Sequence, residues 1–191
     1  MTDARPSLAD HTAAPGAAAP PRRGSRESAL ELMERGWRLK DTTVLDEMAA
    51  PECTYHLAGH PPMGSAEFME LMGQIWRAKP DLRVETFEII EDGDWVATRL
   101  RFSGTQSGEL LGIPPTGRYV SIDEMVLERW DEHGKLLELH QEADFLGMLG
   151  SLGVVPPKDA GPLGIFAHTF TSAIRFTWLR RKARRSGSGS N

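Results

Sequence analysis

The sequence has little cysteine, no long apolar run and no excess of basic charge. Its one cysteine, Cys53, excludes an internal disulfide and any zinc or iron–sulfur site built from several cysteines. No apolar run approaches the roughly 20 residues that span a bilayer, and the N-terminus lacks the apolar core of a secretory signal. A cytoplasmic location is therefore expected.

The charge and the histidines limit the partners further. A net charge of -5 provides no overall basic surface, so nucleic-acid binding is not expected. His56 and His60 are four residues apart, which on a helix would direct both at one metal ion. Gly59, Pro61 and Pro62 preclude that helix, and no third ligand follows at a useful spacing. Neither a metal site nor a cofactor is predicted.

Composition divides the chain into three segments. Residues 1–25 are rich in Ala and Pro and predict a disordered tail, whereas 26–155 predict one folded domain. Residues 156–191 form a Pro/Gly-rich linker and a basic, partly amphipathic tail with Arg175 and a cluster at 180–185. This tail either contacts an acidic partner or membrane surface, or is simply solvated.

Within the domain, helical periodicity comes first. Leu30, Met33 and Trp37 recur at helical spacing behind Ser25 as a plausible N-cap. Further helices are predicted over residues 42–50 and along an apolar stripe from Phe68 to Trp76, with a strand at 53–57 between them. Alternating segments follow at Leu82 to Ile90, Trp95 to Ser103, Tyr119 to Trp130 and Leu136 to Phe145. This order predicts an α+β fold in which helices on one side of a curved antiparallel sheet close a pocket.

The last predicted strand carries the candidate chemistry. Alternation places His140, Glu142 and Asp144 on one face. If this face lines the pocket, burial and like-charge repulsion raise the pKa of one carboxyl and suit it to acid/base work near neutral pH. The alternative is a solvated strand face, with the aliphatic residues turned to the core. Arg99 on strand 95–103 either stabilises an enolate oxygen or is a surface guanidinium.

Two ordered motifs stand out in the second half of the domain. Residues 99–117, RLRFSGTQSGELLGIPPTG, resemble an Arg-bearing strand that runs into GTH-x-GE-x-x-GIPPTG. Residues 134–153 resemble GKI-x-E-x-W-x-x-x-D-x-x-GLL-x-QLG. Together they make the chain similar to the SnoaL-like polyketide or ester cyclases. The resemblance implies the cone-shaped fold shared with nuclear transport factor two, ketosteroid isomerase and scytalone dehydratase.

The resemblance also implies a cofactor-independent mechanism. A strand aspartate of the family exchanges a proton with an acidic carbon of a polyketide methyl ester, and the enolate closes a ring by intramolecular aldol attack. Asp144 matches that aspartate by position, with His140, Gln106 or Arg99 expected to stabilise the enolate. Gln141 stands where many members have another aspartate. The predicted substrate contacts are His56, Glu142, Trp95 and Glu124.

The sequence is consistent with three hypotheses of function. The first is a cyclase acting on an apolar, polyketide-like substrate. The second keeps the fold but changes the reaction to hydroxylation, dehydration, isomerisation or epoxide opening. The third is a non-catalytic ligand-binding or scaffold domain. The resemblance implies a homodimer through the outer sheet face in any of these.

Overall fold

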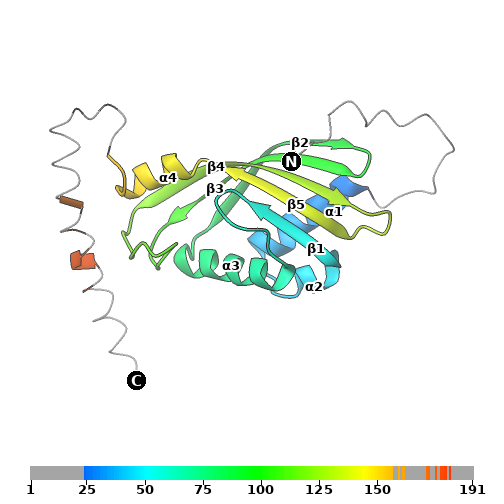
Figure 1. Cartoon of the computed structure of the whole chain (residues 1–191), viewed down its shortest axis with the longest axis horizontal. Coiled ribbons are helices and arrows are strands. Elements are labelled where there is room, and N and C mark those ends of the chain that lie inside the picture. The colour runs from blue at the N-terminus through cyan, green and yellow to red at the C-terminus, as the bar shows by residue number, and fades with distance from the viewer. Residues whose placement is uncertain are drawn as a thin grey trace, which may run out of the picture.

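The computed structural model describes residues 24–156 and, beyond them, 159, 161, 171, 172, 175, 177–179 and 181. It confirms the predicted α+β class: helices pack on one side of a curved sheet of five strands (Figure 1). The predicted disordered tail, except for its last two residues, and most of the predicted basic tail lie outside the described residues. In the described part of the chain, no helix is long and apolar enough to cross a membrane.

The first predicted helix is present but differs in detail. Helix α1 (Ser25–Leu32) is capped by Gly24 and continues as a π-helix, η2 (Met33–Arg38). The predicted apolar stripe is wrong at Leu30, which is 43% exposed, because Ala29 and Leu32 form the buried face. A π-helix has wider turns than an α-helix. Near the end of η2, the ring of Trp37 packs against the ring of Phe102, with 4.7 Å between the ring centroids.

The next segments lead into the sheet. Helix α2 (Val44–Met48) is shorter than predicted, because the chain is already extended at the start of β1 (Ala49–Leu57). Helix α3 (Ser65–Ala78) follows the Gly/Pro loop as predicted. It buries Phe68 and Met72.

The sheet has the order β1-β5-β4-β3-β2. Its other strands are β2 (Arg83–Asp92), β3 (Trp95–Thr105), β4 (Tyr119–Trp130) and β5 (Leu136–Ala143). Neighbours among β2 to β5 are antiparallel, as predicted, but β1 pairs with β5 in parallel. No hairpin joins β1 to β5, so no tight turn imposes an antiparallel direction on this pair.

The last strand is shorter than predicted. It ends at Ala143, and Asp144 is the N-cap of a helix that the sequence reading missed, α4 (Phe145–Leu152). The Asp144 carboxylate accepts a hydrogen bond from the Gly147 N–H at 2.9 Å. Gly153, at φ 71°, ends the helix in the left-handed region that glycine favours.

Strand β4 shows how the sheet divides its side chains. One face is buried against the helices, and it carries Val120, Ile122, Glu124, Val126, Glu128 and Trp130. The other face is exposed, with Met125 57% and Leu127 40% accessible. Two carboxylates therefore stand in an apolar row on the helix-covered face, where an isolated charge is costly.

Candidate active site

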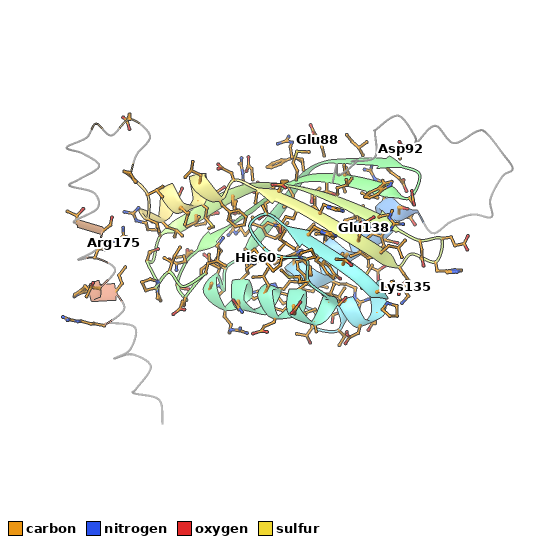
Figure 2. All side chains as sticks on the ribbon, in the orientation of Figure 1. His60, Glu88, Asp92, Lys135, Glu138 and Arg175 are labelled. Atoms are coloured by element: carbon orange, nitrogen blue, oxygen red, sulfur yellow. The ribbon has the colours of Figure 1, made fainter. Side chains whose placement is uncertain are left out.

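A cavity lies between the inner sheet face and helices α3 and α4. Most of its lining is apolar or aromatic: Trp37, Leu57, Phe68, Leu71, Ile75, Phe102, Leu110, Leu111, Ile122, Phe145 and Met148. Four polar side chains complete it, His60, Lys79, Glu124 and Gln141. Figure 2 labels His60 on the loop that follows β1. An apolar cavity with a few convergent polar groups is typical of a small-molecule site.

Glu124 is the central titratable group of this cavity. It lies on β4 and is only 7% exposed. Burial raises its pKa to about 7, although the hydrogen bond from Gln141 and the charge of Lys79 act in the opposite direction. The Gln141 amide Nε2 on β5 donates to Glu124 Oε2. The carboxyl can therefore both take and return a proton near neutral pH.

Lys79 supplies the positive charge of the cavity. It follows the last residue of α3 and is 3% exposed. Burial lowers the pKa of its ammonium group, while the charges of Glu124 and Asp81 partly restore it. A cation held in an apolar wall is suited to stabilising an oxyanion, because water screens it little there.

A second buried carboxyl lies four residues after Glu124 on the same face of β4. Glu128 is 3% exposed, and burial raises its pKa to about 7. Its Oε2 accepts a hydrogen bond of 3.3 Å from the indole Nε1 of Trp130. It lines a smaller adjoining cavity that shares Trp37, Phe68, Phe102, Glu124 and Gln141 with the first.

The ionisable face predicted on the last strand lies on the opposite side of the sheet. Leu139 is 5% exposed and, like Gln141, lines the smaller cavity, so His140 and Glu142 face outward. Glu142 is exposed. The His140 ring stacks on that of His56 at 4.5 Å between centroids. His140 and Glu142 therefore lie on the face of β5 that points away from the cavity.

Three further predicted site residues also lie away from the cavity. Asp144 is exposed and caps α4. Arg99 Nε donates a hydrogen bond to Glu88 Oε2 at 3.2 Å, and its guanidinium group covers the Phe87 ring on the outer face. The ring of Trp95 lies 6.5 Å from that of His140, also on the outer face.

Gln106 is buried, and its side chain forms hydrogen bonds to the loop that follows it. Its amide Nε2 donates to the backbone carbonyls of Gly108, Ile113 and Pro114, at 2.9 to 3.1 Å. Its Oε1 accepts from the N–H and the hydroxyl of Thr116. Gln106 therefore holds the loop that carries Leu110 and Leu111 into the cavity wall, and it does not line the cavity itself.

This arrangement predicts a large effect of replacing Gln106 by leucine. The change removes the side-chain donor to the Gly108 and Pro114 carbonyls and the acceptor of the Thr116 N–H, so the free energy of unfolding is expected to fall by about 3 kcal/mol. Urea denaturation measures this change. Gln74→Leu is the matched control, because Gln74 is exposed on α3. A Gln106→Leu protein as stable as the wild type would contradict the role of this amide.

The polar residues that the sequence reading missed are Lys79, Gln141, His60 and Glu128. A signal was present for the glutamates: both alternate with Val120, Ile122, Val126 and Trp130. That pattern places two carboxylates on the apolar face of a strand, yet only Glu124 was predicted to contact substrate. Lys79 has no comparable signal, because its burial depends on how the end of α3 packs.

Comparison with known proteins agrees with the fold. The sequence profile described as SnoaL-like polyketide cyclase matches residues 27–152. The chain belongs to this family. It is 34% identical over 99 residues to the nogalonic acid methyl ester cyclase of Streptomyces nogalater, a match that covers 51% of this chain and 73% of the relative. The aklanonic acid methyl ester cyclase AcmA of Streptomyces galilaeus is 32% identical, with 50% and 72% covered.

Solved structures of similar proteins superpose on the domain. AclR of Streptomyces galilaeus, a proposed hydroxylase, has a TM-score of 0.62 at 28% identity, with 69% of this chain and 97% of AclR covered. IdmH of Streptomyces antibioticus, a proposed polyketide cyclase, has a TM-score of 0.59 at 29% identity, with 68% and 98% covered. The SnoaL-like chain thus has solved relatives assigned to two reaction types.

Proposed function

We propose that this SnoaL-like protein closes a ring in a polyketide-like ester by a cofactor-independent, intramolecular aldol reaction, with Glu124 as the acid/base. The observation that carries the proposal is a single carboxyl, with a pKa of about 7, in an otherwise largely apolar cavity. A catalytic group whose pKa lies near the working pH is efficient both at removing a proton and at returning it. The family relatives named for ester cyclisation supply the reaction class.

The groups around Glu124 fit each step of this reaction. Ionised Glu124 removes a proton from a carbon activated by neighbouring carbonyl groups, and the Lys79 ammonium stabilises the resulting enolate oxygen. The enolate carbon attacks a ketone of the same molecule and forms the new C–C bond. The alkoxide then takes the proton back from Glu124, so the product has the mass of the substrate. Gln141 holds the Glu124 carboxyl in place throughout.

The cavity must widen to admit such a substrate. Its volume is about 70 Å³, whereas ligand pockets usually measure several hundred Å³. Leu111 is the wall residue best placed to move, because it is 46% exposed and lies at φ 50°, in the left-handed region that is strained for leucine. The substrate is thus proposed to enter past the loop held by Gln106.

The mass of the product tests the reaction class. Purified protein incubated with nogalonic or aklanonic acid methyl ester is expected to give a product of unchanged mass with a new retention time on liquid chromatography. A product with one added oxygen would favour the hydroxylase alternative raised by the similarity to AclR. Loss of water would indicate dehydration, and binding of both esters without conversion would favour a ligand-binding domain.

The proposal extends to the location, the oligomeric state and the partners of the protein. We place the reaction in the cytoplasm, as the sequence predicts. The exposed Met125 and Leu127 support a homodimer through the outer sheet face, since large apolar side chains on a sheet favour contact with a second surface. Contact of the basic C-terminal tail with an acidic partner or a membrane surface stays a prediction.

A further inference from the structure

Three metal-ligating side chains meet on the outer face of β1 and β5. His56 and His140 are partners in the parallel pairing of these strands, and their rings stack at an angle of 6°. Glu138, which is labelled in Figure 2, lies two residues before His140 and therefore on the same face of β5. One ligand atom from each of the three lies within 4.8 Å of the other two.

We propose that His56, Glu138 and His140 bind one divalent transition-metal ion, with zinc as the best fit. Imidazole nitrogen and carboxylate oxygen are ligands that zinc takes at about 2.0 to 2.2 Å, and a tetrahedral ion holds its ligand atoms roughly 3.4 Å apart. His140 Nε2 and Glu138 Oε2 are already 3.3 Å apart. The His140 side chain is 43% exposed in the single chain, so an ion and a water as its fourth ligand can enter from solvent before a second copy covers the outer sheet face.

A neighbouring arginine prepares Glu138 for this role. Arg129 Nε donates to Glu138 Oε1 at 2.5 Å, which fixes the carboxylate and leaves Oε2 directed at His140. Such outer partners orient the ligands of a metal site.

The proposed site is separate from the candidate active site. The residues beside His140, Leu139 and Gln141, face the inner cavities, whereas His140 faces outward. A bound ion would join edge strand β1 to β5 through side chains, in addition to their backbone hydrogen bonds. Because the ion binds the folded state, it is expected to raise the melting temperature, and the rise grows with the logarithm of the ratio of zinc concentration to Kd.

Titration of the full chain with zinc chloride tests the proposal. The protein is prepared without a histidine tag, treated with EDTA, desalted and followed by isothermal titration calorimetry. One ion per chain is expected, with at least about tenfold weaker binding in His56→Ala and His140→Ala. His60→Ala and His133→Ala are the matched controls and are expected to bind as the wild type does, because neither residue belongs to the cluster.

Glu138→Gln keeps the shape of the side chain and guards against a folding defect in the histidine variants. It is expected to fold with an unchanged circular dichroism spectrum, to bind zinc at least about tenfold more weakly and to lose most of the zinc-dependent rise in melting temperature. The proposal is overturned if the wild type binds no stoichiometric zinc. It is equally overturned if all three cluster variants bind zinc as tightly as the wild type.

Discussion

Replacement of Glu124 by glutamine is expected to lower kcat for ring closure by about a thousandfold, the usual contribution of a general acid/base. Glutamine keeps the size of the side chain and can still accept the hydrogen bond from Gln141, but it cannot take a proton. The fold should survive, because removal of a buried charge relieves its desolvation cost. Single-turnover kinetics with the methyl ester substrate, followed by liquid chromatography, measures the loss.

Asp144→Asn is the matched control for this experiment. Asparagine caps a helix about as well as aspartate, so α4 should remain intact. Near wild-type turnover is expected, since Asp144 lies outside the cavity. In the wild type, kcat/KM should rise with pH through about 7, as Glu124 loses its proton. A large loss in Asp144→Asn together with an active Glu124→Gln would transfer the acid/base role to Asp144.

Replacement of Glu128 by glutamine is expected to stabilise the protein at alkaline pH. The pKa of Glu128 is raised from 4.5 to about 7 in the folded state. Between these values the folded chain keeps a proton that the unfolded chain releases, so this residue lowers stability as the pH rises through that window. A glutamine side chain does not ionise, so it does not cause this loss of stability. The gain above pH 7 is about 3 kcal/mol, at roughly 1.4 kcal/mol per pKa unit.

The pH dependence makes this prediction specific. Urea unfolding near pH 8.5 should show the full gain, and unfolding near pH 4.5 should show almost none, because Glu128 is then largely protonated. Glu142→Gln is the control for removal of a negative charge from the sheet, since Glu142 is exposed. An equal gain at both pH values would mean that burial of the charge is not the cause.

Much of the sheet can be predicted from local pattern. The alternation over residues 119–130 coincides with β4, and that beginning at Trp95 coincides with the start of β3. The parallel partner of β1 could not be predicted, because it is set by packing between distant segments. Helix α4 was missed since its two glycines weaken the helical signal, although Asp144 and Gly153 are favourable caps.

The site was harder to predict than the fold. Alternation correctly grouped His140 with Glu142, but it does not say which face of a strand is covered, and the helices cover the other one. Lys79 follows Ala78, whose carbonyl accepts hydrogen bonds from the Ser107 and Gly108 N–H groups of the loop after β3, at 2.9 and 3.0 Å. No local pattern around Lys79 encodes that contact.

The parallel pair of β1 and β5 also bears on the order in which the molecule assembles. His56 meets His140 only after a loop of about 80 residues has closed, which is slow relative to the hairpins of β2 to β5. On the ribosome, β1 has been synthesised long before its partner, and the hairpin between β2 and β3 can form in the meantime. Until β5 emerges, the free edge of β1 can pair with strands of other chains.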